Sequence, residues 1–93
     1  MVESDSPLLI ETSPEGDEVF VHASPEGLRR FAAHLVRLAE QAESGQYPDS
    51  HWFSEAWGGY DLAGSRTEPG RRAVHHLKLY GWPTAGEIPA QGA

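Results

Sequence analysis

The stretch SPEGLRRFAAHLVRLAEQAESG, residues 24–45, decides the fold of this chain of 93 residues. Ser24 supplies a hydroxyl that accepts hydrogen bonds from free backbone N–H groups, Pro25 suits the first helical position, and Glu26 lies near the positive end of the helix dipole. The sequence predicts one helix of about five turns that begins at Pro25 and ends near Ser44-Gly45. Apolar residues recur along it at spacings of three and four, the period of an amphipathic helix; they are Leu28, Phe31, Ala32, Leu35, Leu38, Ala39 and Ala42.

Two short strands are predicted before this helix, at residues 8–12 and 18–22. Residues 8–12 are mostly apolar and lie between Pro7 and the segment SPEGD, residues 13–17. The proline and the glycine of that segment stand where a tight turn needs a fixed φ angle and a positive φ angle. Residues 18–22 then alternate, with valines on one side of the strand and a phenylalanine on the other. The pattern is typical of a β-hairpin.

The region after the helix is strand-like. Residues 50–54 carry aromatic side chains that favour a half-buried, pleated surface. The pair Gly58-Gly59 predicts the turn of a second hairpin, whose partner strand at residues 61–63 is short. Residues 73–82 show the clearest strand pattern. On one side of that strand lie His75, Leu77 and Leu79, and on the other lie Val74, His76, Lys78 and Tyr80.

Together these elements predict an α+β protein in the order β-β-α-β-(β)-β. One helix with one apolar stripe covers one surface, so we expect the amphipathic helix to pack on one face of a small antiparallel or mixed β-sheet of four to five strands. The other face is then left to solvent or to a partner. Residues 8–83 form a single domain in this interpretation. Residues 1–7 are expected to be a flexible N-terminus, and residues 84–93 a flexible C-terminal tail.

The charge balance narrows the classes of function. Seven Lys plus Arg residues stand against fourteen Asp plus Glu residues, which gives a formal net charge of -7. Phosphate backbones and anionic lipid surfaces repel such a chain, so no nucleic acid and no membrane is expected as a partner. The absence of cysteine is typical of a reducing compartment, and residues 1–7 carry acids where a signal peptide needs basic residues. These features predict a cytoplasmic location.

Catalytic and metal-binding patterns are weak. The five histidines show no metal-ligand spacing, since the adjacent His75 and His76 point to opposite faces of a strand. No nucleophile-elbow motif occurs, although Asp49, His51 and Glu55 could form a general acid/base group if one strand extended across them. No deep pocket is expected on so small a fold. We therefore expect no enzymatic activity, no catalytic or metal-binding residue and no cofactor.

The strongest local feature is a concentration of aromatic and acidic residues. Within fifteen residues lie Tyr47, Asp49, Trp52, Phe53, Glu55, Trp57, Tyr60 and Asp61, and Tyr80 and Trp82 follow. A small core has room for only some of these rings, so the rest are either half-exposed cover of the core or an interaction face. Rigid aromatic anchors dominate binding energy, and acids steer a basic partner. The predicted partner-binding residues are Trp52, Glu55, Trp57, Tyr60, Asp61 and Tyr80.

Several segments together resemble a known family. They are VFVH at residues 19–22, PEGL at 25–28, DSHWF at 49–53, WGG at 57–59 and HLKLYGWP at 76–83. This combination resembles the immunity protein thirty-two family, small immunity proteins of bacterial polymorphic toxin systems, over about residues 8–83. None of the segments is a catalytic signature.

The resemblance implies an α+β protein that binds a cognate toxin domain in the cytoplasm of the producing cell. Inhibition would come from stoichiometric binding that covers the toxin's active site or substrate groove, and an acidic surface would suit a nuclease whose site is basic. Two alternatives stay open. One is a structural or regulatory module that self-associates as a homodimer through an unpaired strand edge or the bare face of its sheet. The other is a small enzyme or metal protein that uses His51, His75 or His76.

Overall fold

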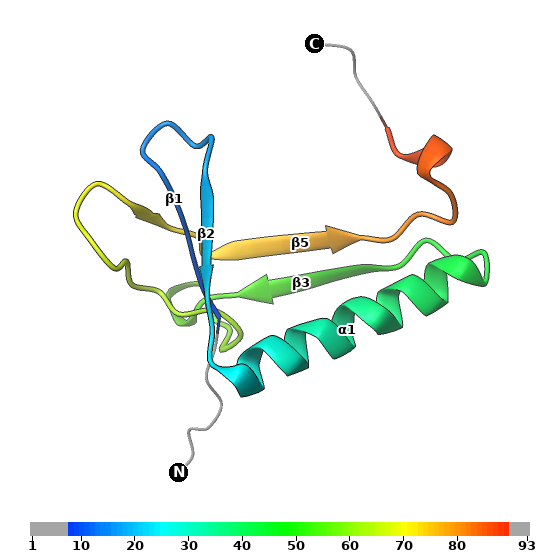
Figure 1. Ribbon diagram of the computed structural model, residues 1–93, viewed down its shortest axis with the longest axis horizontal. Coiled ribbons are helices and arrows are strands. Elements are labelled where there is room, and N and C mark those ends of the chain that lie inside the picture. Colours follow the sequence, from blue (N-terminus) through cyan, green and yellow to red (C-terminus); the bar gives the residue numbers. More distant parts are fainter. Residues whose placement is uncertain (1–7, 90–93) are drawn as a thin grey trace.

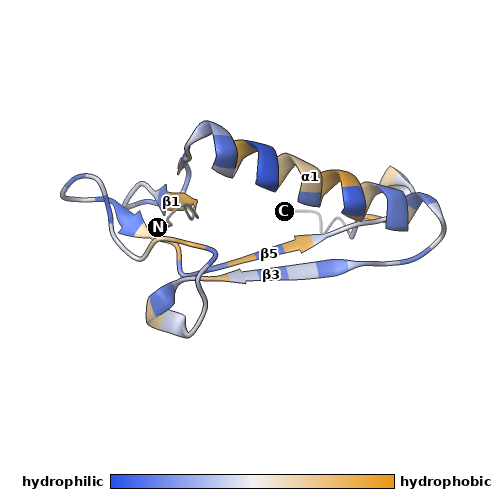
Figure 2. Cartoon of the chain, turned by 90° about the horizontal axis from the view of Figure 1, so that it is seen from below, coloured by the Kyte–Doolittle hydropathy of each residue, from blue (hydrophilic) through white to orange (hydrophobic). Residues whose placement is uncertain are grey.

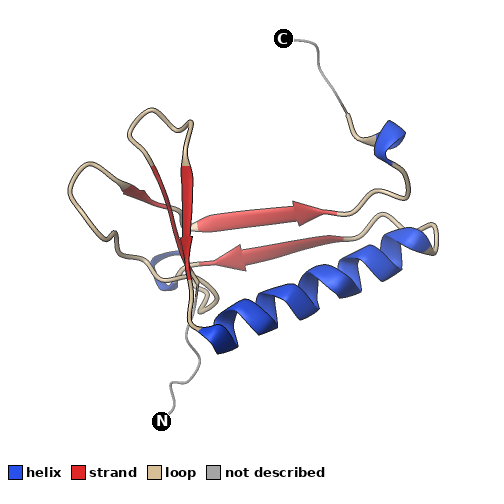
Figure 3. Ribbon diagram, viewed as in Figure 1, coloured by secondary structure: helices blue, strands red, loops and turns tan. Residues whose placement is uncertain are grey.

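The computed structural model describes residues 8–89 (Figures 1 and 3). In chain order its elements are β1 (Leu9–Thr12), β2 (Val19–His22), α1 (Pro25–Glu43), β3 (Asp49–Phe53), a 3-10 helix (Glu55–Trp57), β4 (Arg72–Ala73), β5 (His76–Tyr80) and a second 3-10 helix (Ala85–Glu87). The α+β class and the β-β-α-β-(β)-β order are confirmed. The bracketed strand, however, is β4 rather than the strand predicted at residues 61–63.

The helix α1 has nearly the predicted bounds because local sequence fixes both of its ends. At the start, the Gly27 N–H donates to the Ser24 Oγ at 3.0 Å, and Pro25 occupies the first turn. At the end, Ser44 caps the last turn, and Gly45 follows with a φ of 94°, a conformation that glycine adopts without steric cost.

The strands form two sheets, so the prediction of a single sheet is wrong. β1 is the central strand of a three-stranded antiparallel sheet in the order β2-β1-β4, and β3 pairs with β5 in a two-stranded antiparallel sheet. The predicted hairpin of β1 and β2 is confirmed, with Ile10 opposite Val21. Figure 1 shows this hairpin running across the direction of β3 and β5.

One extended segment, residues 72–80, joins the two sheets. Its first part pairs with β1, and the Val74 N–H donates to the Ile10 carbonyl at 2.8 Å. One residue later the His75 carbonyl accepts the Ser54 N–H at 2.9 Å, and β5 continues along β3. The chain stays extended where its pairing changes from β1 to β3. The alternating sequence pattern therefore continues across both strands and indicates a single strand. Val74 and Leu77, predicted on opposite sides of this strand, both pack against the core.

The predicted second hairpin at Gly58-Gly59 does not form as a pair of strands. After β3 the chain makes the 3-10 helix Glu55–Trp57, and residues 61–63 contribute only isolated parallel bridges from Leu62 to Leu8 and Ser54. Leu62 is 1% exposed, so it fastens the start of β1 beside the end of β3. The chain does reverse here, but it links the two sheets instead of extending one.

The core lies where the two sheets and α1 meet. It consists of buried Leu8, Ile10 and Leu62, surrounded by Ala23, Phe31, Trp52, Val74 and Leu77. Figure 2 shows α1 along one face of the β3-β5 pair, as predicted. Only part of the predicted apolar stripe is covered, because Leu38 and Ala42 are buried whereas Leu28 is 52% and Leu35 41% exposed. The apolar surface of α1 is therefore wider than one sheet face covers.

Residues 84–89 belong to the predicted flexible C-terminal tail. The structure places the 3-10 helix Ala85–Glu87 here, and the Tyr47 hydroxyl donates a hydrogen bond to the Glu87 carboxylate. Tyr47 also packs edge to face on Trp82, with 5.9 Å between ring centroids. The predicted flexible N-terminus at residues 1–7 and the last part of the tail, residues 90–93, lie outside the described residues.

A carboxylate is buried beside the apolar core. Glu11 of β1 is 0% exposed, and it accepts hydrogen bonds from the Thr67 N–H at 2.9 Å, the Thr67 hydroxyl at 2.8 Å and the Arg71 Nη1 at 2.9 Å. The His22 Nε2 lies 2.9 Å from the same carboxylate. Burial alone would raise the pKa of Glu11, but its hydrogen-bonding partners outweigh burial and lower the pKa to about 2. The ionised side chain therefore holds residues 67–71 against β1.

We expect Glu11 to make folding stability depend on pH in the acidic range. Its pKa is 4.5 as a free side chain and about 2 in the folded chain, so its contribution is complete above pH 4.5 and is lost as the pH falls towards 2. The Glu11→Gln variant should be less stable than the wild type near neutral pH and should lose less stability on acidification. Urea unfolding of both proteins between about pH 7 and pH 3 measures the difference. Parallel pH curves for the two proteins would contradict this prediction.

Candidate protein-binding site

The candidate site is the loop of residues 54–65, which leaves β3 and returns to the core. Ser54 begins this loop and is buried, and its Oγ lies 2.8 Å from the His75 Nδ1. The Ser54 carbonyl accepts the Gly59 N–H at 2.8 Å, and buried Leu62 anchors the part of the loop that returns to the core. The 54–65 loop is thus fastened to the core at several points, which fixes the positions of the exposed side chains between them.

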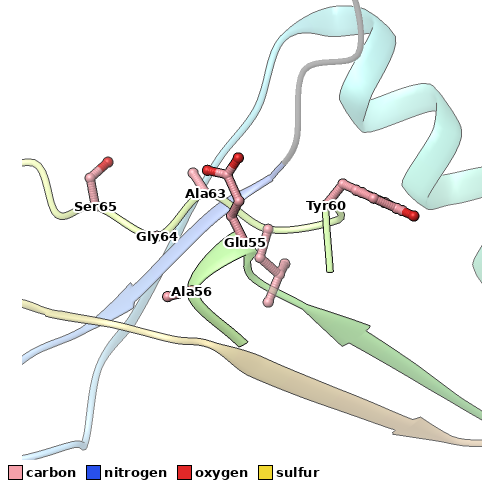
Figure 4. Close-up of a pocket in the computed structure, with 7 residues that line it drawn as sticks. Glu55, Ala56, Tyr60, Ala63, Gly64 and Ser65 are labelled. Atoms are coloured by element: carbon pink, nitrogen blue, oxygen red, sulfur yellow. The ribbon is translucent and has the colours of Figure 1, made fainter. Parts of the chain in front are cut away.

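An open pocket of about 730 Å³ lies along this loop (Figure 4). Its lining residues are Glu55, Ala56, Tyr60, Leu62, Ala63, Gly64 and Ser65. Figure 4 shows the Glu55 carboxylate beside Ala63 and the Tyr60 ring pointing away from Glu55. Glu55 is the one carboxylate among the lining residues and none of them is basic, so the pocket favours a cationic group.

Four of the six predicted partner-binding residues lie on the 54–65 loop. Trp57 is 60% exposed and stacks in parallel on the His75 ring, with 5.7 Å between centroids. Tyr60 is 85% exposed and lines the pocket together with Glu55. Asp61 follows directly, and its Oδ2 accepts the backbone N–H of residue 53 at 3.2 Å. Aromatic and acidic side chains therefore share one short, anchored surface.

The other two predicted residues lie elsewhere. Trp52 points to the helix side of β3 and packs edge to face on Phe31, with 5.2 Å between ring centroids, so it contributes mainly to core packing. Tyr80 is 58% exposed at the far end of β5, opposite Asp49, and the Lys78 Nζ lies 4.7 Å from its ring centre. The length of β5, roughly 13 Å, separates Tyr80 from the end of β3 where the loop begins.

The face of β3 and β5 that is turned away from α1 holds aromatic contacts that the spacing of histidines did not reveal. The His51 Nδ1 lies 2.9 Å from the His76 Nε2, and the Phe53 ring stacks on His76 with 4.5 Å between centroids. The antiparallel register of β3 and β5 brings these side chains together. Only pairing the two predicted strands in this register would have found the contact from sequence.

The suggested acid/base group of Asp49, His51 and Glu55 is not assembled. β3 ends at Phe53, and Glu55 begins the 3-10 helix at the pocket. The Asp49 carboxylate lies 3.9 Å from the Lys78 Nζ, and His51 contacts His76. Within residues 8–89 no three His, Cys, Asp or Glu side chains are grouped so that they could hold a metal ion. Over the same residues, no helix has the length and apolar composition needed to cross a membrane.

A smaller cavity of about 230 Å³ between α1 and β3 was not predicted, and it has a basic side. Its lining includes Arg30, His34 and Arg37 from α1, together with Ser50 and Asp61. The His34 Nε2 lies 2.7 Å from the Ser50 Oγ. Burial and the positive charge of Arg37 lower the pKa of His34, while Asp61 has the opposite effect. Asp61 belongs to the 54–65 loop and also lines the basic cavity, so cationic and acidic surfaces adjoin here.

A known protein family matches most of this chain. The family model for immunity protein 32 matches residues 18–78, well over half of the chain. The chain belongs to the immunity protein 32 family. The range matched by the immunity protein 32 family runs from β2 into β5 and includes α1 and the whole 54–65 loop, and it confirms the family suggested by the sequence segments. The chain has no significant match among curated proteins or solved structures.

We expect the Gly59→Ala substitution to disturb the 54–65 loop. A Cβ atom at this position would lie 2.6 Å from the Phe53 carbonyl oxygen and 2.7 Å from the Phe53 Cβ, so strand backbone would have to move. Overpacking of this kind costs about 1–3 kcal/mol, and thermal unfolding should show a lower midpoint. Gly64→Ala is the matched control, because a Cβ atom there meets only the His75 Cε1 at 4.0 Å. Equal destabilisation by both substitutions would argue against a close packing role for Gly59.

Proposed function

We propose that this chain is an immunity protein that neutralises a cognate bacterial toxin by stoichiometric binding. The observation that carries the proposal is membership in the immunity protein 32 family, whose name indicates protection against a toxin and so implies a protein partner. We further propose that the toxin belongs to a polymorphic toxin system. Binding would take place in the cytoplasm of the producing cell, where a chain without cysteine needs no disulfides.

We propose the 54–65 loop as the surface that contacts the toxin. Trp57 and Tyr60 present large rings that are 60% and 85% exposed, and aromatic residues are enriched among the side chains that dominate binding energy. Glu55 and Asp61 add negative charge beside these rings. Because the loop is fastened to the core, its backbone loses little conformational freedom on binding.

The charge of this surface suits a basic partner. Glu55 lies in a pocket without a basic lining residue, and the chain as a whole has a formal net charge of -7. A toxin that cleaves nucleic acid needs a basic groove to hold its substrate, so a nuclease is the toxin class that this surface fits best. Covering such a groove would exclude the substrate physically. We therefore propose inhibition by occlusion, in which this chain is not an enzyme and supplies no reactive group.

Co-expression with the toxin domain encoded by the neighbouring gene tests the proposed function. The toxin domain alone should stop growth, and the presence of this chain should restore it. The two proteins should also purify as a one-to-one complex. A toxin domain that stays lethal in the presence of this chain, or that forms no complex with it, would contradict the proposal.

A double substitution tests the proposed surface. Trp57→Ala combined with Glu55→Lys removes an aromatic anchor and reverses the charge of the pocket, and it should weaken the complex by about 2 kcal/mol or more, roughly 30-fold in Kd. Both side chains are exposed, so the fold should be retained, which thermal unfolding checks. Isothermal titration with the toxin domain measures the affinity.

The matched control for this double substitution is Glu15→Lys. Glu15 is exposed in the turn between β1 and β2, and its substitution makes the same change in charge outside the 54–65 loop. We expect this control to bind the toxin nearly as well as the wild type. A loss of affinity as large as that of the double variant would show that total charge, and not the 54–65 loop, governs binding.

A further inference from the structure

The helix α1 carries a second row of apolar side chains that its own sheets leave uncovered. Leu28, Ala32, Leu35 and Ala39 follow one another at spacings of four, three and four residues, so they lie along one side of the helix. All four are exposed, and the two leucines are 52% and 41% exposed. We call this row the outer stripe. It is distinct from the row that faces the core, to which Leu38 belongs.

The outer stripe borders an apolar groove of about 500 Å³ between α1 and the end of β5. Leu35 and Ala39 line the groove from the helix, and Leu79 and Trp82 line it from the other side. Glu43 is the only charged residue in the lining. In a chain with a formal net charge of -7, a continuous surface with so little charge is of the kind that marks a contact with another molecule.

We propose that the outer stripe binds the outer stripe of a second copy of this chain, with the two α1 helices antiparallel. A two-fold axis between residues 33 and 34 would place Leu28 opposite Ala39 of the second copy, and Ala32 opposite Leu35 of the second copy. Each leucine then meets an alanine, so large and small side chains interlock along the whole contact. The two-fold axis repeats every contact, as a closed dimer requires.

The charged residues beside the outer stripe favour the antiparallel direction. Arg29 lies near the start of the stripe and Glu40 near its end, on the same side of the helix as Val36, and all three side chains are exposed. With the two-fold axis between residues 33 and 34, Arg29 of one copy lies level with residue 38 of the other, two residues from Glu40, whereas a parallel pair would oppose like charges. Because two copies with a net charge of -7 repel each other elsewhere, this stripe with crossed charges is the surface that fits a second copy.

The proposed contact is short. About three turns of paired helix, extended by the adjoining groove, would bury roughly 1,000 Å² in total, which is the lower end for specific protein interfaces. We therefore expect a reversible dimer with a Kd on the order of 10 µM. This dimer does not depend on the proposed toxin binding, because it can be measured with the purified chain alone.

Sedimentation equilibrium over about 1–500 µM tests the dimer, and the wild type should change from monomer to dimer across this range. Leu35→Glu places a charge at the centre of the contact and should raise the Kd at least roughly tenfold. Ala33→Glu is the matched control, because it adds the same side chain at an exposed position on another side of α1, and its Kd should stay unchanged. A wild type that stays monomeric throughout, or an equal effect of the two substitutions, would overturn the proposal.

Disulfide cross-linking tests the direction of the helices and remains decisive if Leu35→Glu fails to fold. The chain has no cysteine, so Leu28→Cys and Ala39→Cys each introduce a single thiol. In the antiparallel pair a mixture of the two variants should cross-link, while neither should cross-link with itself, because identical positions lie about 16 Å apart along the helices. Efficient cross-linking of Leu28→Cys alone would show a parallel pair and overturn the proposed arrangement.

Discussion

The buried carboxylate of Glu11 is the interaction on which the arrangement of this chain depends. It connects β1 to His22 of β2 and to residues 67–71, which are 56 to 60 positions away in sequence. Because residues 67–71 lead directly into β4, holding them also holds β4 on β1. β4 continues into β5, and β5 carries β3 and the start of the 54–65 loop. This buried polar contact thus acts together with buried Leu62 and the Ser54–His75 contact to position the candidate site.

Local signals explain which elements the sequence predicts correctly. The ends of α1 depend on Ser24 and Gly45, and the β1-β2 hairpin depends on a turn within residues 13–17, so each is decided by neighbours in sequence. The division into two sheets is not a local property, because residues 73–82 alternate in the same way whichever strand they pair with. Glu11 escapes prediction for the same reason, since its partners are remote in sequence.

The sequence predicts the part of the candidate site whose residues are close neighbours along the chain. Residues 55–61 lie on one loop because they follow one another closely, and the aromatic and acidic composition marks them. The composition also groups Trp52 and Tyr80 with them, although the direction of a strand side chain and its distance along a sheet depend on tertiary packing. Periodicity likewise predicts the apolar side of α1. It does not predict how much of that side the two narrow sheets cover, and Leu28 and Leu35 remain exposed.

Residues 72–80 are synthesised after the other paired strands, and both sheets need them. They supply β4 to one sheet and β5 to the other, so both sheets stay incomplete while the earlier strands leave the ribosome. During that interval β3 has no partner and β1 has only β2, and such open strand edges attract other unfolded chains. The 54–65 loop has its His75 contact only after this late segment has been made. A chain cut by a protease before residue 72 would therefore lose both the anchored loop and the strands that keep it from aggregating.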